Sequence, residues 1–138
     1  MDINDSKLYK ILVERDSDFL PNIKKVFEYA EDLLPLVTKV FSDYTQHDVD
    51  HSIMITNYMF EIIDNVDQMN DLEISMMIYS ALLHDIGMVV TDKEIDGIRR
   101  DDLNTIECKY SVVLQALKDD KLALQECIRP IHAKRSAY

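Results

Sequence analysis

Glycine and proline, the residues that most often interrupt regular structure, are scarce in this sequence: its 138 residues include two glycines and three prolines. Sandwiches and barrels need many turns, and disordered chains are usually rich in proline and glycine, so both classes are disfavoured. Apolar residues make up 47% of the chain, which is enough to bury a core. The length fits a single domain, and the composition predicts an all-α fold.

Basic residues are also few, since 15 lysines and arginines stand against 26 aspartates and glutamates and leave a net charge of -11. General attraction to nucleic acid or anionic lipid is therefore not expected, and a cation is a better candidate partner. No apolar run approaches the roughly 18 residues of a membrane span, and the polar N-terminus does not resemble a signal peptide. We therefore predict a cytoplasmic protein without membrane or nucleic-acid partners.

Several sequence motifs are missing as well. The two glycines, Gly87 and Gly97, do not form a phosphate-binding loop. The two cysteines, Cys108 and Cys127, lack the CxxC spacing of zinc ribbons and thioredoxin-like proteins. Because cytoplasmic cysteines are ordinarily reduced, we predict two reduced, buried thiols.

What the sequence does contain is apolar residues at intervals of three and four, the pattern of amphipathic helices. Pro35 predicts a break near Leu33, and residues 88–104 are expected to be irregular or a short helix. We predict a bundle of about five to seven helices, with residues 1–43 as an N-terminal extension packed on a domain of residues 44–138. The helical segments are, by residue number, about 6–19, 21–41, 50–66, 71–87, 105–118 and 121–138.

Three of the four histidines fall in two short motifs, "HDVDH" from His47 to His51 and "HD" at His84 and Asp85. Four residues before Ile55, His51 continues an apolar helical stripe, so we expect it to point toward the core. His84 and Asp85, here called the doublet, continue the inward line of the apolar segment 71–87. A carboxylate buried there costs several kcal/mol unless it is paired or bound to a metal.

These residues suit a metal site. Neighbouring helical residues point about 100° apart, so both residues of the doublet can bind one ion only where the helix loosens. Gly87, two residues after the doublet, is expected to end the helix there. Imidazole and carboxylate ligands with open positions suit Mn, Fe, Ni or Zn. Asp48 or Asp50 is expected to cap the helix, and His47 and Asp48 to line the rim or support the ligands. The alternative, a hydrogen-bonded polar network in a helical scaffold, remains open.

The stretches "YTQHDVDHSIMITNYM" and "ALLHDIGM" resemble the HD-domain superfamily of metal-dependent phosphohydrolases, over residues 44–138. Its signature is a histidine, a His-Asp doublet and a distant aspartate. The ending "IRPIHAKRSAY" resembles a late helix of HD proteins found beside Hsp90-like or histidine-kinase-type ATPase modules. The resemblance implies a helical bundle that hydrolyses a phosphate ester or anhydride, often of a nucleotide.

Transferred by position, His51, His84 and Asp85 resemble the metal ligands, and His132 the additional histidine that binds a second metal or substrate phosphate. The resemblance thus implies catalytic roles for Asp85 and His132. The family's final aspartate lies beyond the helix with that histidine and has no counterpart here, so we expect an N-terminal portion of the domain. Asp119 and Asp120 precede His132 at a helix start, where caps are common.

Arg129, His132 and Lys93 are the candidate phosphate-binding residues, and a phosphorylated small molecule or nucleotide is the expected partner. The alternative for Arg129, Lys134 and Arg135 is that they are solvated charges that complement a helix dipole. A different function also stays open: a non-catalytic regulatory or nucleotide-sensing module in a larger ATPase-associated protein. In that case the N-terminal helices would contact a partner domain or a second copy.

Overall fold

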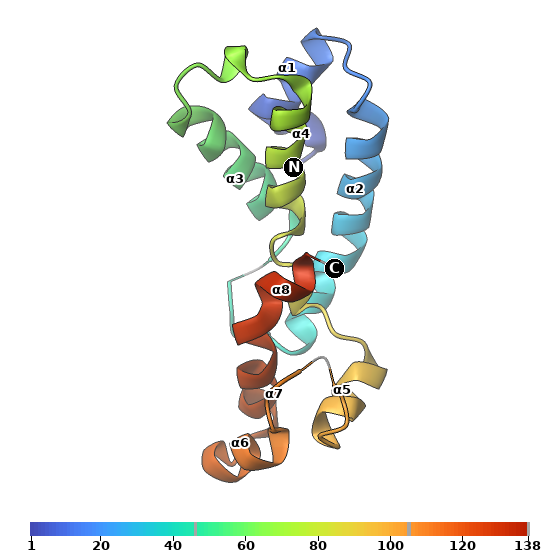
Figure 1. The fold of residues 1–138 in the computed structure, drawn as a ribbon, viewed down its shortest axis with the longest axis vertical. Helices are drawn as coiled ribbons and strands as arrows, with labels where there is room; N and C mark the ends of the chain where they lie inside the picture. Colours follow the sequence, from blue (N-terminus) through green and yellow to red (C-terminus); the bar gives the residue numbers. More distant parts are fainter. Residues whose placement is uncertain (46, 105, 138) are drawn as a thin grey trace.

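The computed structural model describes residues 1–45, 47–104 and 106–137, and all regular structure within these ranges is helical, which confirms the predicted all-α fold. The molecule is elongated, with two groups of helices at opposite ends and α8 between them (Figure 1). One group comprises α1 (Lys7–Glu14), α2 (Leu20–Leu33), α3 (Val49–Ile62) and α4 (Asp71–Leu83). The other comprises α5 (Asp92–Arg99), α6 (Tyr110–Leu117) and α7 (Asp120–Ile128), and α8 spans His132–Ser136.

Short 3-10 helices connect or extend these elements, among them η1 (Ile3–Asp5), η2 (Leu34–Lys39), η3 (Val66–Gln68), η4 (Ile86–Met88) and η5 (Arg129–Ile131). The break predicted near Leu33 is confirmed, because α2 ends there and η2 begins with Pro35 in its first turn. Proline lacks the backbone N–H that would continue an α-helix. The segment predicted as irregular or a short helix contains α5, which Thr91 and Glu94 open with reciprocal capping hydrogen bonds.

A first core lies between α1, α2, α3 and α4, and α4 is its central helix. The predicted inward line of α4 is confirmed, since Ile74, Ile78 and Ala81 are buried. The N-terminal helices contribute Leu8, Leu12, Ile23 and Phe27 to the same core. Residues of the predicted N-terminal extension therefore pack directly on the helices that carry the metal-site motifs, while the boundary at residue 43 stays a prediction.

The side of α3 expected to be buried is buried only in part, since Met59 and Ile63 pack against the first core and Val66, beyond the end of α3, is buried. The residues predicted for that side are Ile55, Tyr58, Met59, Ile62, Ile63 and Val66. Tyr58 and Ile62 are 59% and 78% exposed, whereas Ile53 and Thr56 on the other side are fully buried. Thr56 can be buried because its hydroxyl donates to the Ile53 carbonyl and lies 2.8 Å from the Ser6 hydroxyl. α3 is apolar on both sides, so its periodicity did not decide which side packs.

A second core joins η2 and the residues after it to α5 and α7. Its buried members include Val37, Val40, Phe41, Met88, Ile95, Ile98, Ile106, Ala123, Leu124 and Ile128. Gln125 is buried beside it and donates its side-chain amide to the Val40 carbonyl at 2.8 Å. The doublet therefore lies between two cores, because it follows α4 of the first and precedes Met88 of the second.

The prediction of reduced thiols is wrong: Cys108 and Cys127 form a disulfide, with their Cα atoms 5.1 Å apart. The segment before α6 packs along α7, and this brings together two residues separated by 19 positions. It also explains why α6 begins at Tyr110 rather than near residue 105, since Ile106 and Cys108 are held in the second core.

Within the described ranges, no single helix is long and apolar enough to cross a membrane. A bent pair, Asp71–Met88 with Asp92–Arg99, meets the length and composition criteria, and its first part is the central helix of the first core.

Candidate metal centre

The first motif opens α3. Asp48 is the N-cap, and its carboxylate accepts a hydrogen bond from the His51 backbone N–H at 3.0 Å, which confirms the predicted cap. His51 lies in the first turn of the helix. Because it shares a side with Tyr58 and Ile62, it is exposed, and the expectation that it points toward the core is wrong. The candidate metal centre is therefore open on the α3 side.

The doublet follows α4, which ends at Leu83, four residues before the expected Gly87. His84 keeps helical backbone angles, and Asp85 departs to φ -99° and ψ -2° before η4 begins. This change of direction loosens the helix at the doublet itself. It lets the two neighbouring side chains turn toward one point, as the metal-site hypothesis requires.

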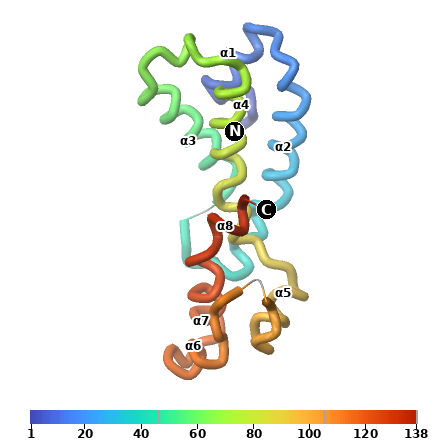
Figure 2. Tube along the Cα trace, viewed as in Figure 1, coloured from blue at the N-terminus to red at the C-terminus, as the bar shows by residue number. Residues whose placement is uncertain are grey.

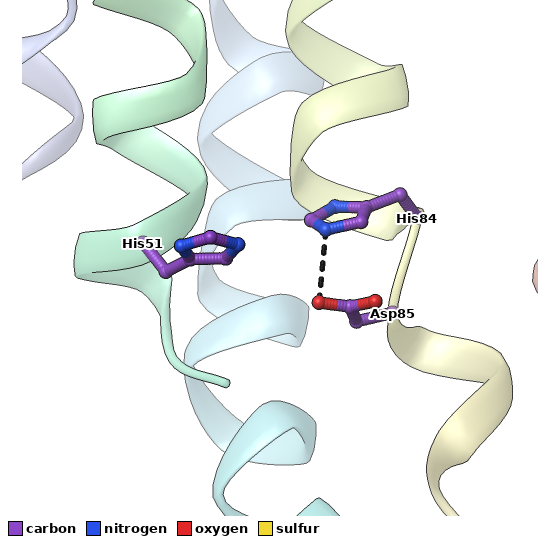
Figure 3. A group of neighbouring side chains, drawn as sticks. All are labelled: His51, His84 and Asp85. Atoms are coloured by element: carbon purple, nitrogen blue, oxygen red, sulfur yellow. Dashed lines mark ion pairs between the residues drawn. The ribbon is translucent and has the colours of Figure 1, made fainter. Parts of the chain in front are cut away.

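His51, His84 and Asp85 converge, as Figure 3 shows: His51 extends from α3 toward the two side chains at the end of α4. One ligand atom from each residue lies within 4.8 Å of the others. His84 Nε2 lies 2.8 Å from Asp85 Oδ2. Residues 33 positions apart in the sequence thus form a single group of two imidazoles and one carboxylate.

The hydrogen bonds of His84 indicate what such a group binds. Its Nδ1 lies 2.8 Å from the Ala81 carbonyl oxygen, which can only accept, so Nδ1 carries the hydrogen. In the metal-free protein a proton on Nε2 bridges the 2.8 Å to Asp85 Oδ2. A divalent ion can take the place of that proton, because a neutral His84 presents the lone pair of Nε2 beside the Asp85 carboxylate.

Asp85 is 6% exposed and keeps its charge despite burial. Burial raises the pKa of its carboxyl, but hydrogen bonds from His84 and His47 outweigh this and lower the pKa to about 2. The hydrogen bond to the same carboxylate is the main reason that the pKa of His84 is raised, although burial opposes it. Asp85 is therefore ionised at neutral pH, as a metal ligand must be.

His47 contacts the site from within the protein. Its Nδ1 lies 2.6 Å from Asp85 Oδ2, and its Nε2 is buried without a hydrogen-bond partner. Since an ionised carboxylate only accepts, Nδ1 donates and holds the Asp85 carboxylate in place. The sequence placed His47 at the rim, and its hydrogen bond to Asp85 became visible only in the structure.

The other predicted site residues lie outside this group. His132 is held through Nδ1 by the Arg129 carbonyl at 2.6 Å, and the Arg129 guanidinium lies over the Tyr44 ring and donates to its hydroxyl at 3.1 Å. Lys93 is exposed on α5. Asp119 caps α7, as predicted, and Asp120 pairs with Arg99.

Two residues of α8 were missed by sequence reasoning. Arg135 was interpreted as a solvated charge, but its guanidinium donates to the carbonyls of Gly87 and Val89. The Ser136 hydroxyl bonds both Gly87 and His84. Both residues belong to the stretch "HAKRS", part of the ending that resembles a late helix of HD proteins. That resemblance gave no contact for either side chain.

A pocket of about 530 Å³ lies next to η4, and none of the three candidate ligands lines it. Its lining residues are Ile86, Gly87, Glu94, Asn104, Glu107, Ile131, Lys134 and Arg135. The charges around it are mixed, two acidic and two basic. It meets the doublet segment, defined as residues 84–89, through Ile86 and Gly87.

An all-helical bundle in which a helix-opening histidine meets a His-Asp doublet defines an HD-type domain. The family model HD-CE matches residues 41–138, more than two thirds of the chain, and the chain belongs to the HD-CE family. Comparisons with curated proteins and with solved structures give no match.

Proposed function

We propose that this chain is a metal-dependent phosphohydrolase of the HD type that holds a divalent ion, Mn, Fe, Ni or Zn, through His51, His84 and Asp85. Its substrate is a phosphate ester or anhydride in a phosphorylated small molecule or nucleotide. The observation that carries the proposal is the convergence of three ligand atoms within 4.8 Å from two helices. The family match over residues 41–138 supports it.

A divalent ion bound here supplies Lewis-acid charge and a water whose pKa is lowered toward neutrality. Ala81 fixes the tautomer and ring orientation of His84, so that Nε2 faces the ion. His47 fixes the Asp85 carboxylate. A carboxyl with a pKa of about 2 is a weak base at neutral pH, so Asp85 contributes as a ligand rather than as a proton acceptor.

Substrate phosphate requires cationic or hydrogen-bonding partners near the ion. His132, Arg129 and Lys93 stay the residues predicted for this task from the sequence. Arg129 is already stacked on Tyr44, which would orient its guanidinium for a planar oxyanion. A cytoplasmic location likewise stays a prediction.

Elemental analysis of the purified protein tests metal binding directly. We expect bound Mn, Fe, Ni or Zn in the wild type and its loss in the double variant His84→Ala, Asp85→Ala. Asp120→Ala is the control, because it removes a carboxylate that pairs with Arg99 outside the ligand group and should retain the metal. Equal metal content in the double variant and the wild type would refute the metal site.

A hydrolysis assay with added Mn, over nucleotides and a generic phosphodiester, tests the activity. The full-length protein should be used, so that every ligand it possesses is present. We expect turnover that disappears in Asp85→Ala. Metal binding without turnover on any of these substrates would leave the site intact and reject the enzyme.

The second candidate function is a non-catalytic regulatory or nucleotide-sensing module. It is favoured by the exposed row Met54, Tyr58 and Ile62 on α3, since apolar rows of this kind are typical of contact surfaces. α4 exposes Leu72 and Met76 as well. A contact with a partner domain or a second copy through α3 and α4 is therefore proposed beside the predicted contact through the N-terminal helices, where Val13 and Tyr29 are exposed as well. Tight nucleotide binding without hydrolysis would select this function.

A further inference from the structure

α8 lies directly against η4, the turn that follows the doublet. Figure 2 shows the chain leaving α4 through η4, passing through α5 to α7, and returning as α8 beside η4. A Cβ atom at Gly87 would lie 2.0 Å from the His132 carbonyl oxygen and 2.7 Å from the Ser136 backbone nitrogen. The two backbones can approach this closely because residue 87 has no side chain.

Ser136 joins the two ends of this turn. Its hydroxyl accepts a hydrogen bond from the Gly87 N–H at 2.8 Å and donates one to the His84 carbonyl at 2.8 Å. The His84 carbonyl is one of the groups that a helix leaves unpaired at its C-terminus. One side chain of α8 therefore satisfies a backbone group of the doublet and a backbone group two residues beyond it.

Arg135 binds the same segment from the next position of α8. Its Nε donates to the Gly87 carbonyl at 2.8 Å, and a terminal nitrogen donates to the Val89 carbonyl at 3.0 Å. The same nitrogen pairs with Glu94 of α5 at 3.2 Å, and the side chain is 17% exposed. This half-buried guanidinium holds two carbonyls at fixed positions, which a lysine ammonium cannot do with the same geometry.

The doublet segment needs such support because it is no longer α-helical. Asp85 has left the helix, and within the segment the Asp85 and Ile86 carbonyls accept 3-10 bonds from Met88 and Val89. The direction of the Asp85 side chain depends on these backbone angles. A metal ligand displaced by a fraction of an ångström loses affinity, so the segment must be held still.

We propose that Ser136 and Arg135 are positioning residues for the metal-binding doublet: through four hydrogen bonds to residues 84, 87 and 89, α8 fixes the backbone from which His84 and Asp85 reach the ion. The inference rests on the proposed metal site. Neither residue touches the ion or substrate, and both act on metal affinity through the backbone.

The test combines two measurements on the full chain: Mn²⁺ affinity by titration calorimetry and amide hydrogen exchange of the doublet segment in the metal-free protein. Ser136→Ala should weaken Mn²⁺ binding about tenfold and speed exchange of the Gly87 amide by about the same factor. Ser136→Thr, which keeps the hydroxyl, should restore both. Arg135→Lys should weaken binding in the same direction and is the second variant, should Ser136→Ala fail to fold.

The matched control is Ser80→Ala, which removes a serine hydroxyl from α4 that bonds only to its own helix, at the Met76 carbonyl. It should change neither measurement. If the wild type binds Mn²⁺ and both Ser136→Ala and Arg135→Lys bind it equally well, the inference is overturned. If the wild type binds no metal, the proposed function fails and the positioning inference fails with it. If the wild type binds Mn²⁺ and Ser136→Ala speeds exchange at Gly87 without weakening Mn²⁺ binding, α8 only stabilises the turn, and the positioning inference alone fails.

Discussion

The two cores are stabilised in different ways. In the first, three of the four helices, α2 to α4, have 13 or 14 residues, and they pack through apolar side chains together with a few buried hydroxyls such as those of Ser6 and Thr56. The second, around α5 to α7, is made of helices of eight or nine residues that are joined by a disulfide and by an Arg99–Asp120 ion pair. Because each short helix buries little apolar surface, the disulfide and the ion pair add stability to this core.

The doublet segment connects these two regions. Ile86 packs against the first core, and Met88 is buried in the second. The candidate metal ligands thus lie where a well-packed region meets a cross-linked one, with α8 bonded to the segment between them (Figure 1). The geometry of the site therefore depends on both cores, whereas its open side depends on α3.

The largest effect expected is from a cavity in the first core. Ile53→Ala should lower the free energy of unfolding by about 3 kcal/mol, because Ile53 is fully buried. Ile62→Ala on the same helix should cost less than about 0.5 kcal/mol, because Ile62 is 78% exposed. Urea unfolding measures both. If Ile62→Ala lowered the free energy of unfolding as much as Ile53→Ala, the exposed row Met54, Tyr58 and Ile62 of α3 would be covered in solution.

Loss of the disulfide should affect the second core. Cys108→Ser with Cys127→Ser should destabilise the protein by about 2–4 kcal/mol, and a reductant should do the same to the wild type. The serine variant should not respond to the reductant, which serves as the control. Alkylation of both cysteines in untreated protein, detected by mass spectrometry, would contradict the pairing.

The free energy of unfolding of the metal-free protein should depend on pH through the doublet, which lies between the two cores. The folded pKa of Asp85 is about 2 against an ordinary value of 3.8, so it adds about 2 kcal/mol that is present above pH ~4 and is lost as pH falls toward 2. The pKa of His84 is raised, so its share is present below about pH 6.5 and is lost as pH rises through the folded pKa. Unfolding measured from pH 2 to 8 should show both slopes, and Asp85→Asn should flatten them.

The smallest expected losses of stability come from replacing two arginines, Arg15 in the first region and Arg99 in the second. Arg15 donates to the Met69 and Asp67 carbonyls and to Asp71, joining the end of α1 to the turn before α4. Arg15→Ala should cost about 1–2 kcal/mol. Arg99→Ala removes an exposed ion pair and should cost less than about 1 kcal/mol. A reversed order in thermal unfolding would show that the second region relies more on its polar links than the first.

Part of the site could be read from the sequence because it depends on local chemistry. Asp48 caps α3 through a bond to the third residue beyond it, and Asp85 follows an apolar helix whose inward line is regular. The exposed position of His51 could not be read in this way, because α3 carries apolar residues on both sides. Periodicity places residues on a face, but only packing decides which face is buried.

By itself the sequence determined the all-α class, the break at Pro35, the caps and the identity of the residues that converge at the doublet. The first three depend on backbone chemistry and on spacing within single helices, and the last depends on the resemblance of two motifs to the HD signature. The tertiary structure decided the rest: the Cys108–Cys127 pair, the His47 bond to Asp85 and the contacts of Ser136 and Arg135 across the doublet segment. Each joins residues 19 to 52 positions apart, and helical periodicity does not relate residues so far apart on different elements.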